Sequence, residues 1–133
     1  MHTVTVSSHI AASPDTVWSM IGNPSSISAW HPAISESPVD TDMRRCTLAD
    51  GAQISERIES VDATGRAYTY TITESPLPLT DYRSTIQVSA EGNGSVVDWT
   101  SSFEPAGAPS EDVAELLKGV YSAGLGALRA QFA

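Results

Sequence analysis

One long apolar stripe near the end of the chain constrains the fold most strongly. Within residues 110–132, apolar side chains recur every three or four positions, which is the period of an amphipathic α-helix. The stripe consists of Val113, Leu116, Leu117, Val120, Tyr121, Leu125, Leu128 and Phe132. A helix of roughly 20 residues is about 30 Å long, which is enough to cross a small sheet. The stripe therefore predicts a helix that covers one face of the remaining chain.

Most of the preceding sequence alternates with the two-residue period of half-buried β-strands. We expect strands over residues 3–11, 34–39, 44–48, 53–61, 66–74, 82–90 and 95–103. After the first strand, Ser13-Pro14-Asp15 is typical of a helix start and Gly22-Asn23-Pro24 of a helix end, and residues 25–29 suit a second short helix. Strands that follow one another through short turns form antiparallel meanders. The sequence predicts one α+β domain over residues 1–133, with a curved sheet of six or seven strands wrapped round the last helix.

Composition excludes several classes of protein. The 133 residues carry a net charge of −9 and no basic stripe, so neither nucleic acid nor an anionic membrane is an expected partner. Cys46 is the single cysteine and cannot form an internal disulfide, and the three histidines lack metal-ligand spacing. No apolar run is long enough to span a bilayer, and the N-terminus does not resemble a signal peptide. We expect a cytoplasmic monomer or homodimer that binds no metal.

A carboxylate on an apolar strand face is the clearest functional signal. Glu56 lies between Ile54 and Ile58 on the inward face of the strand over residues 53–61. A buried carboxylate is costly unless it is paired. The preceding strand offers two arginines, Arg44 and Arg45.

Strand parity separates the two arginines. Arg44 shares a face with the apolar residues Cys46 and Leu48, whereas Arg45 faces the other way. We therefore expect Arg44 to meet Glu56, although the pair could serve only to stiffen the sheet. A fixed positive charge beside a carboxylate suits proton transfer next to a carbonyl. Tyr70 and Tyr82 could donate hydrogen bonds to the same substrate, and this chemistry requires no cofactor.

The order of elements and several motifs resemble a known superfamily. The chain is similar to START/SRPBCC proteins in three features: Ile10–Trp18, the segment Ser28-Ala29-Trp30-His31-Pro32, and the strand series before the amphipathic helix. That superfamily has the birch-pollen-allergen-like helix-grip fold, and the chain looks most like its polyketide cyclase/dehydrase branch. The resemblance covers nearly the whole chain. It implies a pocket between sheet and helix, but it does not separate enzymes from carriers.

A narrower resemblance concerns the candidate site. The candidate site looks like the pocket of lachrymatory-factor-synthase-type and MxaD-type proteins. The resemblance rests on the adjacent arginines Arg44 and Arg45 and on Glu56, Tyr70 and Tyr82. In the plant branch, an arginine and a glutamate handle the proton, so the resemblance implies catalytic roles for Arg44 or Arg45 and for Glu56. We expect ten further residues to line the ligand pocket: Trp30, His31, Ile54, Ile58, Tyr68, Ile86, Trp99, Phe103, Leu117 and Tyr121.

Two functional classes follow from these signals. The first is a cofactor-independent cyclase, dehydratase or isomerase acting on a hydrophobic or polyketide-like substrate. The alternative is a carrier or sensor of a hydrophobic lipid or aromatic ligand. Three glycines of the last helix, Gly119, Gly124 and Gly126, either allow close packing on the sheet or leave room for the ligand. His31 either exchanges protons near the pocket or fixes its loop.

Overall fold

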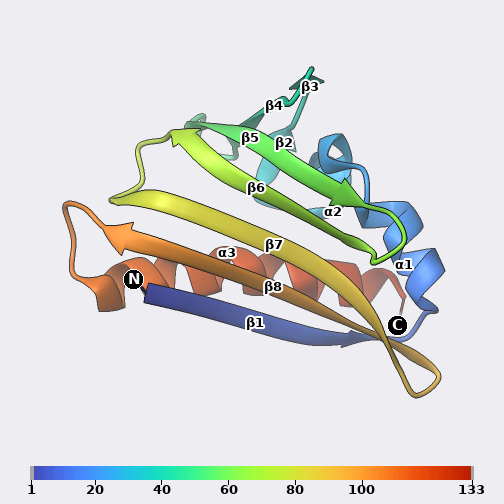
Figure 1. Ribbon diagram of the computed structural model, residues 1–133. Helices are drawn as coiled ribbons and strands as arrows, with labels where there is room; N and C mark the ends of the chain where they lie inside the picture. The colour runs from blue at the N-terminus through green and yellow to red at the C-terminus, as the bar shows by residue number, and fades with distance from the viewer. Residues whose placement is uncertain (1, 133) are drawn as a thin grey trace.

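The computed structural model describes residues 2–132 (Figure 1). Its helical elements are α1 (Pro14–Ile21), the 3₁₀ turn η1 (Pro24–Ser26), α2 (Ile27–Trp30) and α3 (Ser110–Gln131). Its strands are β1 (His2–Ile10), β2 (Ile34–Glu36), β3 (Val39–Asp40), β4 (Met43–Leu48), β5 (Gln53–Asp62), β6 (Ala67–Glu74), β7 (Leu79–Glu91) and β8 (Gly94–Pro105). The predicted α+β helix-grip fold is confirmed.

The strands form one antiparallel sheet in the order β1-β8-β7-β6-β5-β4-β2, with β3 paired to β4. The strands from β4 to β8 are a meander, as the short turns predict. The first strand joins the far edge by pairing with the last, and Val6 lies opposite Trp99. Figure 1 shows α3 running along the sheet beside β1, β7 and β8, while α1 and α2 lie at one end of the sheet. Helix α3 packs chiefly against β1 and β8.

Within residues 2–132 the sheet has eight strands, one more than predicted, because the predicted strand over residues 34–39 is split. Pro38 lies between β2 and β3 and has no N–H to donate to a ladder. Strand β7 also starts at Leu79, earlier than predicted, because a bulge allows it to continue past Asp81. Asp81 has a φ of 53°, a left-handed conformation that non-glycine residues adopt rarely and asparagine or aspartate most readily.

Helix α1 begins where its sequence predicts. The Ser13 hydroxyl accepts a hydrogen bond from the Thr16 amide at 3.2 Å, and Pro14 occupies the first helical position. The hydroxyl satisfies one amide that otherwise lacks a partner at a helix start, and Pro14 has no N–H that would need one. Val17 and Ile21 are the buried residues of this short helix.

The apolar stripe of α3 is narrower in the structure than in the prediction. Its buried residues are Val113, Leu117, Tyr121, Gly124, Leu125 and Leu128. Leu116 and Val120 remain 38% and 37% exposed, because they lie at the edge of the helix face that meets the sheet. A helix contacts a sheet over a limited angle, so periodicity alone overestimated the buried stripe.

The three helical glycines have different environments. A Cβ atom built on Gly124 would lie 2.5 Å from Cδ2 of His31, so close packing requires glycine there. Within residues 2–132, a Cβ built on Gly119 or Gly126 would meet no atom within 4 Å apart from its chain neighbours and the backbone of its own helix. Both of these glycines are exposed to solvent and do not face the interior. The idea that helical glycines make room for a ligand is therefore not supported.

Candidate functional site

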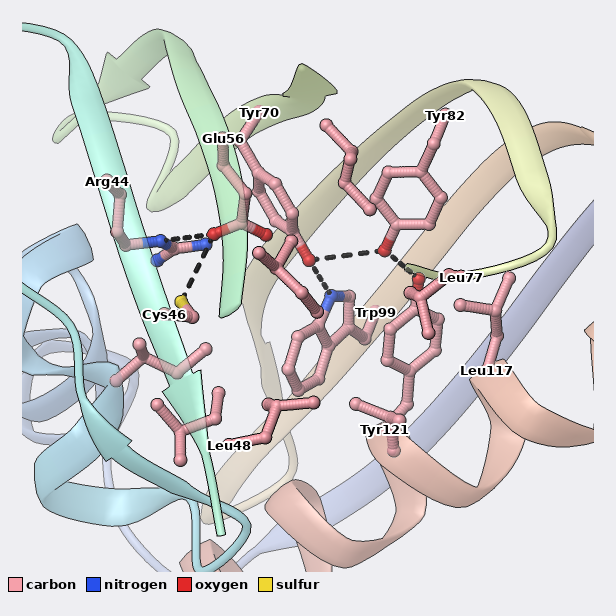
Figure 2. A pocket seen from close by; sticks show the side chains of 15 residues that line it. Arg44, Cys46, Leu48, Glu56, Tyr70, Leu77, Tyr82, Trp99, Leu117 and Tyr121 are labelled. Atoms are coloured by element: carbon pink, nitrogen blue, oxygen red, sulfur yellow. Dashed lines mark hydrogen bonds and ion pairs between the residues drawn. The ribbon is translucent and has the colours of Figure 1, made fainter. Parts of the chain in front are cut away.

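A cavity of about 80 Å³ lies between the sheet and α3. It is lined by Ile27, Ile34, Arg44, Cys46, Leu48, Ile54, Glu56, Tyr70, Ile72, Leu77, Tyr82, Trp99, Leu117, Val120 and Tyr121. Figure 2 shows a polar row made by Arg44, Glu56, Tyr70, Tyr82 and Tyr121, with Leu48, Leu77 and Leu117 among the apolar residues around it. The cavity is therefore mainly apolar but carries one polar side.

Arg44 and Glu56 form a buried ion pair on neighbouring strands. They are register partners in the β4–β5 ladder, so their side chains leave the sheet on the same face. Arg44 Nε donates to Glu56 Oε1 at 2.7 Å, and the two side chains are 0% and 8% exposed. Arg45 is exposed, and its register partner in the β4–β5 ladder is Ser55. The parity argument therefore selected the arginine that the structure places inside.

The guanidinium of Arg44 uses two of its three nitrogens. Nη1 donates to the Pro24 carbonyl at 2.9 Å and to the Tyr68 hydroxyl at 3.1 Å. Its central carbon also lies 4.8 Å from the centroid of the Tyr70 ring, within cation–π range. Nη2 is buried and has no hydrogen-bond acceptor among the described residues. A buried donor without a partner is costly, and this one belongs to a residue that lines the cavity.

Glu56 leaves one carboxylate oxygen free of these bonds. Both Arg44 Nε and the Cys46 thiol donate to Oε1, the latter at 3.2 Å. Oε2 takes neither bond, and Figure 2 shows it on the side of Tyr70. Burial first, and the Glu56 carboxylate second, raise the pKa of Cys46 to about 12. The thiol therefore stays protonated at neutral pH and acts as a donor rather than a nucleophile.

A chain of hydroxyl groups continues the polar side of the cavity. The Trp99 indole N–H donates to the Tyr70 hydroxyl at 3.1 Å. The Tyr70 and Tyr82 hydroxyl oxygens are 3.3 Å apart, and the Tyr82 hydroxyl also bonds to that of Tyr121. Burial raises the pKa of Tyr70 and Tyr82 well above the ordinary value. These phenols are therefore neutral at physiological pH and can donate hydrogen bonds.

Irregularities in the sheet lie beside Glu56 and Tyr82. The β5–β6 register shifts between Ser55 and Glu56, and the β7–β8 register shifts between Thr80 and Arg83. The second shift brackets Tyr82. Bulges of this kind re-aim side chains and often lie next to active sites.

The structure brings the four predicted catalytic residues to one cavity. Arg44, Glu56, Tyr70 and Tyr82 all line it. Four of the ten predicted ligand contacts also line it, namely Ile54, Trp99, Leu117 and Tyr121.

The other six predicted ligand contacts do not line the cavity. They are Trp30, His31, Ile58, Tyr68, Ile86 and Phe103. Ile86 and Phe103 are completely buried in the core, and Tyr68 lies behind the ion pair, where its hydroxyl accepts from Arg44. Ile58 is a half-buried residue that packs against the core. Sharing an inward face therefore does not guarantee contact with the cavity.

His31 fastens α2 to α3 instead of facing the cavity. Its Nε2 bonds to the Val120 carbonyl at 2.8 Å, and its Nδ1 accepts from the Ala33 amide at 3.1 Å. Both ring nitrogens are thus engaged by the backbone. Burial lowers the pKa of His31, with the Val120 bond opposing that shift. Its neighbour Trp30 packs against Trp99, with ring centroids 5.8 Å apart.

Several cavity residues were not predicted as ligand contacts: Ile27, Ile34, Cys46, Leu48, Ile72, Leu77 and Val120. For Cys46 and Leu48 a signal existed, because both share the strand face of Arg44. Leu77 lies in the loop between β6 and β7, where strand periodicity gives no information.

Comparison with known proteins identifies the family. A model of the family described as polyketide cyclase / dehydrase and lipid transport matches residues 1–133. The chain belongs to this family. XoxI from Bacillus cereus is 38% identical to this family member, with a TM-score of 0.96 over 99% of this chain and 96% of that chain. An uncharacterized protein from Bacillus thuringiensis is also 38% identical, with a TM-score of 0.94 over 98% of both chains.

A more distant structure supports the fold alone. A START superfamily protein from Mycobacterium smegmatis is 14% identical, with a TM-score of 0.84 over 99% of this chain and 97% of that one. No curated protein matches this sequence.

The family and the cavity together make this a protein with a pocket for a hydrophobic ligand. None of the helices in residues 2–132 is both long and apolar enough to cross a membrane.

Proposed function

We propose that this protein is a cofactor-independent enzyme that transfers a proton at a carbon next to a carbonyl group. The reaction class is cyclisation, dehydration or isomerisation of a hydrophobic or polyketide-like substrate. The observation that carries the proposal is the Arg44–Glu56 pair: both residues line the cavity, Arg44 Nη2 has no hydrogen-bond partner among residues 2–132, and Glu56 Oε2 does not take part in the bond between them. A catalytic base and a donor for the developing oxyanion are the two groups this chemistry needs.

Each polar residue has a role in this reaction. Glu56 Oε2 takes the proton from carbon and returns it to the product. Arg44 Nη2 donates to the oxygen on which negative charge develops. The neutral phenols of Tyr70 and Tyr82 donate to a second oxygen of the substrate. Ile54, Trp99, Leu117 and Tyr121 enclose the apolar part, and excluding water strengthens each of these electrostatic contacts.

The Cys46 thiol supports Glu56 in this scheme. Its hydrogen bond to Oε1 adds to that from Arg44, so Oε1 is held in place. The free oxygen Oε2 is thereby oriented before the substrate binds. Pre-organised groups avoid the reorganisation that would otherwise add to the barrier.

A carrier is the second candidate function. It is favoured by the many apolar residues of the lining, such as Leu48, Ile72 and Leu77, and by a family description that includes lipid transport. In a carrier, the Arg44–Glu56 pair would only orient or recognise the ligand. The cavity volume of about 80 Å³ is small beside the roughly 300–1,000 Å³ of typical ligand pockets.

Mass spectrometry of reaction mixtures distinguishes the two functions. Wild type and Glu56→Gln are mixed separately with a panel of polyketide-like, aromatic and fatty-acid compounds, and the small molecules released from each are identified. The enzyme proposal expects wild type to convert a compound that Glu56→Gln retains unchanged. Glu59→Gln is the matched control, because Glu59 is exposed on the same strand. Recovery of the same unaltered compound from all three proteins would instead establish the carrier.

A further inference from the structure

The charges that line the cavity cancel. Arg44 and Glu56 carry opposite charges 2.7 Å apart. The other ionisable residues of the lining are Cys46, Tyr70, Tyr82 and Tyr121. Burial raises the pKa of each of these four residues, so all four are neutral at physiological pH. The cavity is polar on one side but has no net charge to offer a ligand.

The free donor of this site would bind an acceptor oxygen. Arg44 Nη2 is fully buried and has no partner in residues 2–132. Buried donors are rarely left unmatched, and an oxygen of a bound molecule would complete the guanidinium. The oxygen of a ketone, an aldehyde or an amide satisfies that donor without bringing a charge into the cavity.

A carboxylate would satisfy the same donor at a much higher cost. The charge of Arg44 is already balanced by Glu56, so a second carboxylate would be buried without compensation. It would also lie near Glu56 Oε2, which is on the Tyr70 side of the pair (Figure 2). Like charges at such short range in a poorly solvated site repel strongly.

Cavity size limits the part of the ligand that enters. An engineered apolar cavity of about 150 Å³ binds benzene, whereas the volume here is about 80 Å³. The polar end of the ligand must therefore be compact. Leu48, Ile54, Ile72 and Leu77 line the cavity and are half-buried, so a longer apolar portion would extend between them towards the surface.

We propose that the cavity selects compact, uncharged carbonyl compounds and rejects the corresponding carboxylates. The carbonyl oxygen accepts from Arg44 Nη2, and the neighbouring C–H bond faces Glu56 Oε2. This inference rests on the proposed proton-transfer site but concerns charge selectivity, which equilibrium binding measures without any turnover. It excludes simple fatty acids as the resident ligand.

Three matched probes test the selectivity. 3-Methylbutan-2-one, isobutyramide and isobutyrate share one shape and one number of non-hydrogen atoms, but only isobutyrate is charged at pH 7. Each is titrated into isotopically labelled wild type, and the shifts of the cavity methyl resonances of Leu48, Ile54 and Leu117 are followed. We expect the ketone and the amide to bind at least about tenfold more tightly than isobutyrate, a difference of about 1.4 kcal/mol.

Glu56→Gln should reverse this preference, because it leaves the Arg44 charge without a counter-charge. We expect isobutyrate to become the tightest of the three probes in that variant. In the double variant Arg44→Met/Glu56→Gln the cavity again has no net charge, so the increased affinity for isobutyrate should disappear. Far-UV circular dichroism checks that each variant is folded, and the wild-type series decides the question alone if Glu56→Gln does not fold.

The inference would be overturned if isobutyrate bound wild type as tightly as the ketone, or if none of the three probes bound. It would also be overturned if folded Glu56→Gln gained no affinity for isobutyrate. These outcomes are separate from a failure of the enzyme proposal. A selective cavity without turnover would be a carrier of neutral carbonyl compounds, whereas turnover in a cavity that accepts carboxylates equally would leave the enzyme proposal standing.

Discussion

At the scale of single residues, the Arg44–Glu56 pair governs both stability and chemistry. Each charge is tolerable inside the sheet because the other lies 2.7 Å away. Burial alone would lower the pKa of Arg44, but the acidic groups around it, Tyr68 and Glu56 foremost, raise it well above its ordinary value. The guanidinium therefore remains charged at physiological pH.

Removing one member of the pair should be much worse than removing both. We expect Arg44→Met or Glu56→Leu alone to lower the free energy of unfolding by about 3–5 kcal/mol, because the remaining charge is buried and unpaired. The double variant should lie close to wild type, since two apolar side chains replace the pair. Urea unfolding of the four proteins measures these differences.

An exposed ion pair between β5 and the turn before β4 provides the control. Arg57 and Asp42 are 3.6 Å apart, and each side chain is 53% exposed. Arg57→Met should change the free energy of unfolding by no more than about 1 kcal/mol. Single variants at Arg44 and Glu56 that were no worse than this control would show that the buried pair contributes little to stability.

His31 should make the protein less stable in mild acid. Burial lowers its pKa in the native protein, whereas an unfolded histidine titrates near about 6.5. Below that pH the unfolded chain binds a proton that the native chain does not. The free energy of unfolding is therefore highest above about pH 6.5 and falls as the pH decreases through that value. The slope for one proton is at most about 1.4 kcal/mol per pH unit.

Urea midpoints between pH 7.5 and 5.5 (about the range over which an unfolded histidine titrates) test this expectation. His31→Gln should flatten the decline, because glutamine can still donate to the Val120 carbonyl but does not titrate. His9→Gln, on the exposed side of β1, is the matched control. An equally steep decline in wild type and His31→Gln would assign the acid sensitivity to other groups.

At the scale of elements, α3 illustrates what periodicity predicts and what it does not. Its length and its buried residues Val113, Leu117 and Leu128 follow from apolar spacing. The exposure of Leu116 and Val120 does not, because it depends on how wide a face of the helix the sheet covers. Likewise, the contact between Gly124 and His31 joins α3 to the loop after α2, which no local pattern reveals.

The helical glycines give a matched test of that contact. We expect Gly124→Ala to destabilise the protein, by about 1–3 kcal/mol, because its methyl group would overlap the His31 ring. Gly119→Ala and Gly126→Ala should be stabilising by about 0.5–1 kcal/mol, since alanine is the better helix former and their surroundings are open. Thermal unfolding distinguishes the signs, and a stabilising Gly124→Ala would contradict the packing described.

At the scale of the whole molecule, the order of elements was sufficient to predict the fold. A series of strands joined by short turns and ending in one long amphipathic helix leaves few other arrangements. The pairing of β1 with β8 was not predicted, because it joins the two ends of the strand series. Strand parity placed Arg44 and Glu56 on the inward faces of their strands.

The extent of the cavity could not be predicted in the same way. Ile86 and Phe103 share the inward face with the cavity residues but belong to the packed core. Which inward residues border empty space depends on the curvature of the sheet, on bulges such as that at Asp81 and on the fit of side chains from different elements. Sequence periodicity contains none of these quantities.

The central claim is that Glu56 exchanges a proton with carbon in a cavity shaped by this fold. Deuterium incorporation at either α-carbon of 3-methylbutan-2-one in D₂O, followed by NMR with and without protein, tests it most directly. Wild type and Glu59→Gln should accelerate incorporation, and folded Glu56→Gln should lose about 10²–10⁴-fold of that acceleration. Equal acceleration by wild type and Glu56→Gln, or none by wild type while the ketone is bound, would contradict the claim.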